Sequence, residues 1–325
     1  MKEKDLLKIS EPIQNELKEF QKRFSEVLKS KVALLDLITK YILKQKGKRI
    51  RPILVLSSAK MCGDINDRTY IAANLVELLH TATLIHDDVV DDAKTRRGIA
   101  SINAVWKNKV AVLIGDFLLS KGLMISLDAN EYDFLKSTTN AVKRMSEGEL
   151  LQIQKARNFD ATEETYFKVI SDKTASLIKT CCEIGAMSAT GDKNKIKLMS
   201  DFGENIGIIF QLRDDLLDYI GRKKLLGKST GNDLKEKKFT LPLIVSLRNA
   251  PSSKSKEMMK LIKSDSLKKF DKVYEFVYEY GGISYTDEKI KYYSDEAYNI
   301  LNSFPDSEIK NSLKSLVFFI SNRNY

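Results

Sequence analysis

Cysteine, proline and glycine are all scarce in this 325-residue chain, which has 3 Cys, 5 Pro and 15 Gly. The odd number of cysteines, two of them adjacent at Cys181 and Cys182, does not form a disulfide framework, so we expect a reducing compartment. No proline occurs in residues 53–241. This long stretch is rich in Leu, Ala, Lys and Glu, which favours helices joined by short loops.

Targeting and membrane signals are also missing from the sequence. Residues 1–20 contain no apolar stretch suited to a signal peptide, and no segment reaches the roughly 20 apolar residues that a membrane span needs. We therefore expect a cytoplasmic protein that touches membranes at most peripherally.

The net charge of +10 comes mostly from lysines scattered along the chain. There is no arginine-rich arm, and aromatic residues are not interleaved with basic ones. This distribution favours a solvated lysine-rich surface over a nucleic-acid interface, so we expect no nucleic-acid partner. A small anionic substrate is compatible with the same charge.

Apolar periodicity predicts helices along nearly the whole chain. They span residues 14–44, 53–62, 68–92, 101–108, 110–128, 131–155, 162–189, 195–220, 240–249, 255–281 and 285–320. A Lys- and Gly-rich segment, 221–238, interrupts them and is the best candidate for a mobile loop. Because no linker-like stretch and no tandem repeat occurs, we predict that 1–325 is one all-α domain.

The first unusual feature is LIHDDVVDDAKTRRG at residues 84–98. On a helix, Asp87 and Asp91 lie one turn apart on one face, with Asp88 beside them, and His80 falls on the same stripe. Aspartate is unfavourable inside helices, and like charges at this spacing destabilise them further. A single cluster of this kind could be a solvated helix end.

A second cluster, FQLRDDLLDY at residues 210–219, repeats the spacing. It contains Asp214, Asp215 and Asp218, with Gln211 one turn earlier on the same side. Two DDxxD sequences, each ending a strongly apolar helix, favour a shared function over two accidental acidic helix ends.

Carboxylates one turn apart offer hard oxygen ligands, which suit Mg²⁺ completed by waters and substrate phosphates. Zinc is disfavoured because the only histidines, His80 and His86, do not belong to a set with zinc-ligand spacing. Arg96 and Arg97 carry planar guanidinium groups suited to bidentate contact with anionic oxygens. The pattern therefore predicts a site for Mg²⁺ and phosphate.

Two further motifs carry cations that could bind anions. In GKRIRP, Lys48, Arg49 and Arg51 gather at the start of a helix, where anions are favoured. SDKTASLI places Lys173 and Thr174 in an otherwise apolar helix, where a lysine could equally extend to water. Each motif alone is weak.

Together these motifs resemble those of the trans-isoprenyl (polyprenyl) diphosphate synthases, and most of all the long-chain octaprenyl type. They follow the family order: GKRIRP, HDDVVDDAKTRRG, SDKTASLI, FQLRDDLLDY and GKSTGNDLKEKKFTLP. The resemblance implies a bundle of long antiparallel helices around a deep central cavity, usually in a homodimer, with 221–238 as a mobile active-site loop. It implies a prenyltransferase that condenses isopentenyl diphosphate with an allylic diphosphate, such as farnesyl diphosphate, repeatedly. The product would be an all-trans polyprenyl diphosphate for quinone side chains.

The resemblance also implies a role for each motif residue. Three Mg²⁺ ions would hold the allylic diphosphate through Asp87, Asp91 and Asp214, supported by Asp88, Asp215 and Asp218. The same diphosphate would contact Arg96, Lys173, Lys228 and Lys238. Isopentenyl diphosphate would contact Lys48, Arg51, His80 and Arg97. Thr174 and Gln211 would line the reacting carbon, where Lys173 also acts.

In this family, the residues four and five positions before the first aspartate often set the product length. Here they are the small Thr83 and Ala82, followed at helical spacing by Leu79 and Leu75. Each helical turn rises about 5.4 Å, close to one isoprene unit, so an aliphatic stripe favours a long product. An octaprenyl-like product is expected, with the floor of the pocket on the facing helix 110–128.

Other functions compatible with parts of the pattern remain. A short-chain farnesyl or geranylgeranyl diphosphate synthase would share the chemistry. A non-catalytic subunit of a two-component synthase tends to lose its aspartate motifs, and both are intact here. A terpene cyclase would usually carry Asn, Ser or Thr and Glu in its second metal motif, in place of DDLLD.

Overall fold

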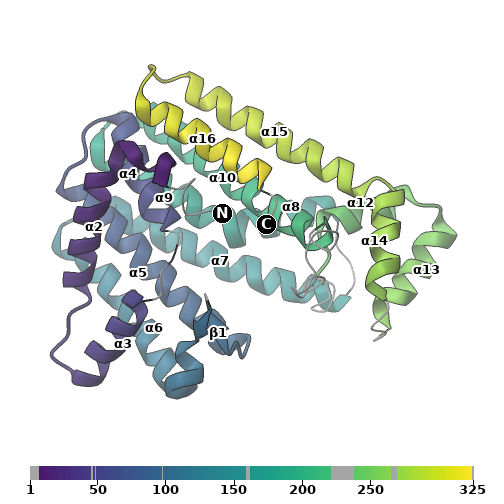
Figure 1. Ribbon diagram of the computed structural model, residues 1–325, viewed down its shortest axis with the longest axis horizontal. Coiled ribbons are helices and arrows are strands. Elements are labelled where there is room, and N and C mark those ends of the chain that lie inside the picture. Colours follow the sequence, from purple (N-terminus) through teal and green to yellow (C-terminus); the bar gives the residue numbers. More distant parts are fainter. Residues whose placement is uncertain are drawn as a thin grey trace.

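The computed structural model of the chain describes residues 7–44, 47, 49–96, 98–158, 162–220, 238–264 and 269–323. It confirms an all-α fold of long helices (Figure 1). The elements up to the middle of the chain are η1 (a 3₁₀ turn, Glu11–Ile13), α2 (Gln14–Val27), α3 (Ala33–Lys44), α4 (Ile50–Cys62), α5 (Asp67–Val90), β1 (Thr95–Arg96), β2 (Ile99–Ala100), α6 (Ile102–Asp128) and α7 (Tyr132–Asn158). They are followed by α8 (Glu163–Ile170), η2 (a π-helical turn, Ser171–Ala175), α9 (Ser176–Ala189), α10 (Lys193–Ile220), α12 (Leu241–Asn249), α13 (Ser252–Lys263), α14 (Lys269–Glu279), α15 (Gly282–Asn302) and α16 (Glu308–Asn322).

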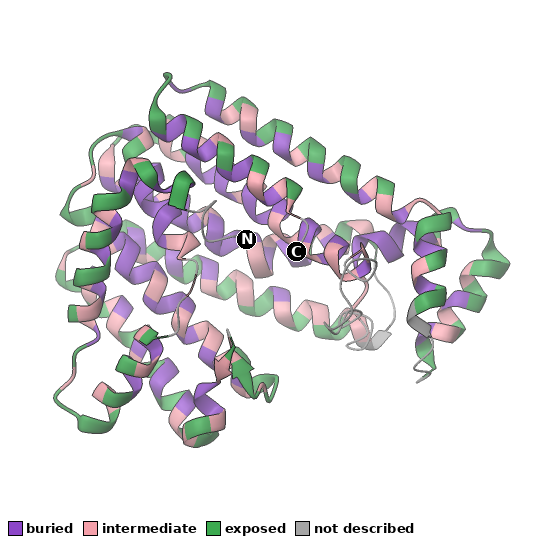
Figure 2. Ribbon diagram, viewed as in Figure 1, coloured by how far each residue is buried: buried purple, intermediate pink, exposed green. Residues whose placement is uncertain are grey.

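The core runs along the central helices. α9 packs between α4 and α10, α5 packs along α6, and α15 lies along the outer side of α10. Figure 2 shows buried residues concentrated on these central helices, while α2 and α15 expose their outward sides. The main apolar cluster takes residues from η1 through α16, and a smaller one joins α12, α13 and α14.

Helix α5, which carries the first aspartate motif, is fixed at its start by a capping box. The Asn66 side chain accepts from the Thr69 N–H at 3.3 Å, and the Thr69 hydroxyl accepts from the Asn66 N–H at 3.2 Å. The Asn66 amide also donates to the Ser188 carbonyl at 2.9 Å, which ties α5 to the end of α9.

Helix α6 is the one described helix that is long and apolar enough, by length and composition, to cross a membrane. This differs from the expectation that no segment would qualify. The helix packs along α5, with Ile114 and Leu118 buried. Its other side exposes Val105, Val112, Leu113, Met124 and Leu127.

Candidate active site

The first aspartate motif lies where α5 ends. Asp87 and Asp88 are in its last turn, and Asp91 is its C-terminal cap, with an N–H that donates to the Asp87 carbonyl at 2.8 Å. Helical geometry therefore extends to Asp91, and both Asp87 and Asp91 are exposed one turn apart. Asp92 follows with a left-handed φ of 48°, which turns the chain away.

Asp88, between the two exposed aspartates, is buried and paired with Arg96. The Arg96 Nε donates to Asp88 Oδ1 at 2.7 Å, and its Nη2 donates to the same oxygen. Pairing of β1 with β2 sets Arg96 opposite Ile99 and so holds it beside the end of α5. Asp88 thus orients an arginine at the edge of the motif.

The second aspartate motif occupies the last turns of α10. Asp215 is buried and accepts two hydrogen bonds, from Tyr166 Oη at 2.6 Å and from Gln211 Nε2 at 2.7 Å. Asp214 is half-exposed and pairs with Arg323 Nη2 at 2.6 Å. Asp218 is also partly exposed, one turn after Asp214. The helical spacing predicted for both motifs is present.

Lys173 and Thr174 lie in the π-helical turn η2, between α8 and α9. Such turns are rare and occur frequently at functional sites. The Lys173 ammonium lies 2.8 Å from Gln152 Oε1 and 2.5 Å from Glu149 Oε2, both on α7. Thr174 donates to Gln211 Oε1 at 2.9 Å, which joins η2 to the Asp215 hydrogen bonds.

A cavity of about 190 Å³ brings these groups together. Its lining comes from α7, α8, η2, α10 and the residues just before α12. It contains five of the predicted residues: Lys173, Thr174, Gln211, Asp215 and Lys238. Val169, Ile170 and Phe239 add apolar surface.

Lys173 also affects the pKa of Asp87 in the first motif. Although Asp87 reaches solvent, crowding by neighbouring helices raises its pKa, and the Glu149 and Asp91 carboxylates add to the rise. Lys173 and Arg96 oppose it. Lys173 therefore lies close to the carboxylate of Asp87 and also lines the cavity that contains Asp215.

A second, smaller cavity of about 40 Å³ lies next to the basic loop. Arg49, Glu77, Asp88 and Arg96 contribute to its lining, with apolar residues from α2, α3 and α5. Arg49 adopts a left-handed φ of 48° as the N-terminal cap of α4. Arg49 and Arg96 both line this cavity, which therefore carries two guanidinium groups.

The other predicted residues of this region have mixed placements. Arg51 is half-buried in the first turn of α4, and His80 is buried in α5; neither belongs to the lining of the small cavity. Lys48, Arg97 and Lys228 lie outside the described residues, as does the predicted loop 221–238 except Lys238. Their roles stay predictions.

The predicted chain-length residues form a continuous stripe on α5. Leu75, Leu79 and Ala82 are buried, and Thr83 is partly exposed with its hydroxyl donating to its own helix at the His80 carbonyl, at 2.9 Å. Neither of the two cavities is lined by this stripe. On the facing α6, Met124 is 49% exposed and so points away from the core.

Sequence reasoning missed several residues of the site. Gln152 and Glu149 contact Lys173, Tyr166 contacts Asp215, and Arg323 contacts Asp214. Glu149 and Gln152 are three residues apart and therefore lie on the same face of α7. Polar residues at this spacing occur on any solvated helix, so the sequence did not single them out. Arg323 comes from the far end of the chain and has no local signal.

The donor atoms fit Mg²⁺. Asp87, Asp91 and Asp214 supply hard carboxylate oxygens that are exposed or partly exposed to solvent. Over the part of the chain that the structure describes, no three Asp, Glu, His or Cys side chains form a set able to hold a metal by themselves. Mg²⁺ typically takes one or two carboxylates from a protein and its other ligands from phosphate and water.

An all-α bundle with two aspartate motifs and a lysine between them defines a class of enzyme that acts on diphosphates, and comparisons with known proteins agree. Residues 32–279 match the polyprenyl synthetase family. The all-trans-nonaprenyl-diphosphate synthase (geranyl-diphosphate specific) of Rhodobacter capsulatus is 33% identical, covering 94% of each chain. The octaprenyl diphosphate synthase of Haemophilus influenzae is 32% identical over the full length of both chains. The geranylgeranyl diphosphate synthase of Saccharolobus solfataricus is 31% identical, covering 93% of this chain and 94% of that protein.

Solved structures give the same result. A decaprenyl diphosphate synthase from Rhodobacter capsulatus superposes with a TM-score of 0.91 at 30% identity, covering 98% of each chain. A polyprenyl synthase from Caulobacter crescentus, solved with calcium and isoprenyl diphosphate, superposes with a TM-score of 0.88 at 30% identity and the same coverage. The chain therefore belongs to the polyprenyl synthetase family. It is a trans-prenyl diphosphate synthase, a prenyltransferase.

Proposed function

We propose that this enzyme is a long-chain synthase that extends farnesyl diphosphate with isopentenyl diphosphate to an octaprenyl-like all-trans product for quinone side chains. The observation that carries the length is the stripe on α5: the small Thr83 and Ala82, then the aliphatic Leu79 and Leu75. Short-chain enzymes close the pocket with bulky side chains four and five positions before the first aspartate. Here these positions are Thr83 and Ala82, and neither side chain is bulky. The octaprenyl and nonaprenyl relatives support this assignment.

In this proposal, Asp87, Asp91 and Asp214 hold three Mg²⁺ ions together with the allylic diphosphate. Bound Mg²⁺ would neutralise charge that develops on the departing diphosphate. The carboxylates of Asp88 and Asp215 act indirectly, because Asp88 holds Arg96, and Asp215 is held by Tyr166 and Gln211.

The cations around the cavity bind and orient the substrates. Lys173 and Lys238 line the larger cavity, where their ammonium groups can contact the allylic diphosphate. Arg49 and Arg96 line the smaller one; Arg49 suits the diphosphate of isopentenyl diphosphate, whereas Arg96, which acts on Asp87, is assigned to the allylic diphosphate. Lys48, Arg51, His80, Arg97 and Lys228 are proposed to contribute by resemblance.

The reaction joins the two substrates when the allylic carbon–oxygen bond ionises, the isopentenyl double bond attacks the resulting cation, and a proton is lost to the released diphosphate. When the allylic carbon–oxygen bond breaks, Lys173 faces the leaving diphosphate and stabilises its charge. The Thr174 hydroxyl and Gln211 amide are hydrogen-bonded to each other, which keeps these polar groups oriented beside the reacting carbon. The apolar lining from Val169, Ile170 and Phe239 limits water that would trap the cation.

Assembly and location are part of the proposal. The exposed apolar side of α6, which includes Leu113 and Met124, would be covered in a homodimer. A Leu113→Glu variant should then shift a dimer toward monomer in sedimentation, and an unchanged dimer would place the interface elsewhere. We further propose one all-α domain over 1–325, in the cytoplasm with at most peripheral membrane contact.

A short-chain product is the second candidate, favoured by the geranylgeranyl diphosphate synthase relative. The decisive experiment supplies purified enzyme with farnesyl diphosphate, labelled isopentenyl diphosphate and Mg²⁺, and then separates the dephosphorylated alcohols by length. A product near eight units supports the proposal. Arrest at three or four units overturns the length assignment, and absence of any product favours a non-catalytic subunit of a two-component synthase.

A further inference from the structure

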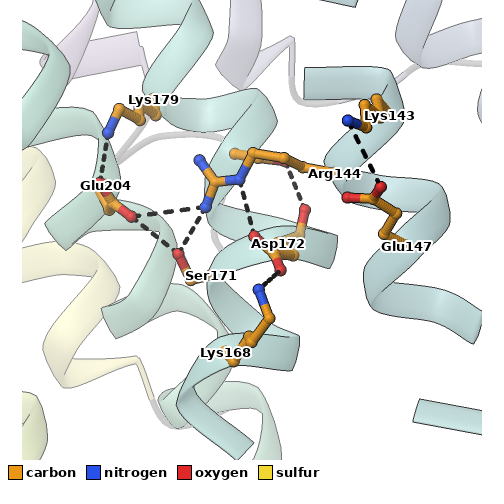
Figure 3. A network of polar contacts seen from close by, with 9 residues as sticks. Lys143, Arg144, Glu147, Lys168, Ser171, Asp172, Lys179 and Glu204 are labelled. Atoms are coloured by element: carbon orange, nitrogen blue, oxygen red, sulfur yellow. Dashed lines mark hydrogen bonds and ion pairs between the residues drawn. The ribbon is translucent and has the colours of Figure 1, made fainter. Parts of the chain in front are cut away.

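A group of polar side chains, all buried or half-buried except the exposed Lys168, surrounds the π-helical turn η2 and includes residues with no role in the proposed chemistry (Figure 3). It joins α7, α8, α9 and α10 to the turn. We call it the Arg144 cluster, and its members are Arg144, Lys168, Ser171, Asp172, Lys179 and Glu204.

Arg144, from α7, makes the central contacts. Its Nε donates to Asp172 Oδ1 at 2.8 Å, and its Nη2 donates to Ser171 Oγ at 2.9 Å. The Asp172 side chain is only 9% exposed, and Lys168 reaches its other oxygen at 3.0 Å. Hydrogen bonds from Arg144 and Lys168 outweigh burial and lower the pKa of Asp172. A buried carboxylate held in this way fixes its backbone in place.

The turn is also held from α10. Ser171 Oγ donates to Glu204 Oε1 at 2.8 Å, and Lys179 Nζ donates to Glu204 Oε2 at 2.6 Å. Ser171 thereby links Arg144 on α7 to Glu204 on α10, as Figure 3 shows.

Close helix contacts leave the turn little space. A Cβ at Gly148 on α7 would lie 3.0 Å from the Asp172 Cβ and the Lys173 N. A Cβ at Gly207 on α10 would lie 2.4 Å from the Ala175 Cα. The turn is therefore packed directly between two helix backbones.

The same helix α7 contacts the turn at two levels. Arg144 holds Asp172, and about two turns further along, Gln152 holds the neighbouring Lys173. A π-helical turn contains one more residue than an α-helical turn, and its relaxation to α-helix would rotate flanking residues by about 100°. Such a rotation would break the hydrogen bond of Lys173 with Gln152 or that of Thr174 with Gln211.

We infer that the Arg144–Asp172 pair is a positioning device: it keeps η2 in its π-helical register so that Lys173 faces the diphosphate. Arg144 acts through Lys173 and touches no substrate. The inference rests on the proposed function, since it assigns Lys173 to the allylic diphosphate.

The test compares Arg144→Ala and Arg144→Lys with a matched control, Lys143→Ala. Lys143 is the neighbouring basic residue of α7, and among the described residues its contact is an exposed one with Glu147 at 3.8 Å. Two measurements are made: steady-state kinetics give kcat and KM for the allylic diphosphate, and calorimetry gives the Kd of inorganic pyrophosphate with Mg²⁺. Each is repeated in the Lys173→Ala background as a double-mutant cycle.

We expect Arg144→Ala to lower kcat and weaken pyrophosphate binding by roughly tenfold, because small misplacements of a catalytic group are costly. Arg144→Lys should recover part of the loss, and Lys143→Ala should change neither quantity. In the Lys173→Ala background, Arg144→Ala should have almost no further effect. Should Arg144→Ala fail to fold, Asp172→Asn replaces it in the same cycle.

Equal losses from Arg144→Ala with and without Lys173 would overturn the inference, since they would indicate general destabilisation. The pyrophosphate measurement separates this from failure of the proposed function. An enzyme that binds pyrophosphate with the expected coupling but transfers no prenyl group would keep the positioning role and reject the activity. Wild-type protein that binds no pyrophosphate would reject both.

Discussion

Arg323, which directly follows the last helix, lies 2.6 Å from a carboxylate oxygen of Asp214, the first aspartate of the second motif. Its guanidinium also donates to the Phe210 carbonyl at 2.9 Å and stacks over the Phe210 ring. Its own carbonyl accepts from Arg213 Nε at 2.8 Å. The end of α16 is thus attached to the part of α10 that carries a proposed metal ligand.

This contact makes Arg323 a competitor for the metal. A cation beside Asp214 neutralises the carboxylate that Mg²⁺ would use, so Arg323→Ala should tighten Mg²⁺ binding to the substrate-free enzyme. A half-exposed ion pair contributes up to about 1 kcal/mol, so the gain should reach roughly fivefold. Titration with Mn²⁺ followed by electron paramagnetic resonance measures it. Arg323→Lys keeps the charge and should resemble wild type; weaker metal binding in Arg323→Ala would show that Arg323 assists the site.

Asp87 and Asp214, two of the proposed metal ligands, should be indispensable. Asp87→Ala and Asp214→Ala should each lower kcat with Mg²⁺ by about a hundredfold or more while leaving the helical circular dichroism unchanged. The matched control is Asp92→Ala, because Asp92 is exposed beside the same motif and pairs with Lys94 at 2.7 Å. Near-normal turnover in both motif variants would refute the metal assignment.

A bulky side chain on α5 should shorten the product. Thr83 is partly exposed, and its hydroxyl bonds only within its own helix among the contacts that the structure describes, so replacement need not break a tertiary contact. Because we propose that the growing chain follows the α5 stripe, Thr83→Phe should place a ring across that path and shift products to about three or four isoprene units, as alcohol chromatography would show. Thr83→Val, of nearly equal volume, should keep the wild-type length. Unchanged products in Thr83→Phe would mean that the chain grows along another path.

Much of this fold follows from local patterns. The apolar helices that carry the aspartates were predicted at 68–92 and 195–220 and are observed at Asp67–Val90 and Lys193–Ile220. The errors lie where the prediction gave one helix and the structure has two, as in 255–281 and 285–320. The division between two such helices depends on capping residues such as Ser307. By contrast, the predicted division between 101–108 and 110–128 is present as a kink within α6, where Lys107 has a non-helical φ of 72° and ψ of 161°.

The site was predictable only where its chemistry repeats at helical spacing. Both aspartate motifs were found in this way, whereas Lys173 and Thr174 were assigned a role only through the resemblance to a known family. The π-helical register of Lys173, its contact with Glu149 and the approach of Arg323 depend on how distant helices pack, which a periodicity argument does not contain. The pairing of Asp88 with Arg96 likewise required the β1–β2 turn, which the sequence did not indicate.

The last prediction concerns acid stability and depends on Glu204. Hydrogen bonds from Lys179 and Ser171 lower the pKa of Glu204 below its ordinary value of 4.5, against the opposing effect of burial. The unfolded chain therefore takes up this proton at higher pH than the folded protein does. The stabilisation is complete above pH 4.5, and it is lost as pH falls from 4.5 through the folded-state pKa. Glu204→Gln removes this titration, so the difference in unfolding free energy between wild type and variant should shrink across that range. Urea denaturation between pH 7 and pH 3 measures it, and a difference that stays constant with pH would contradict the assigned shift.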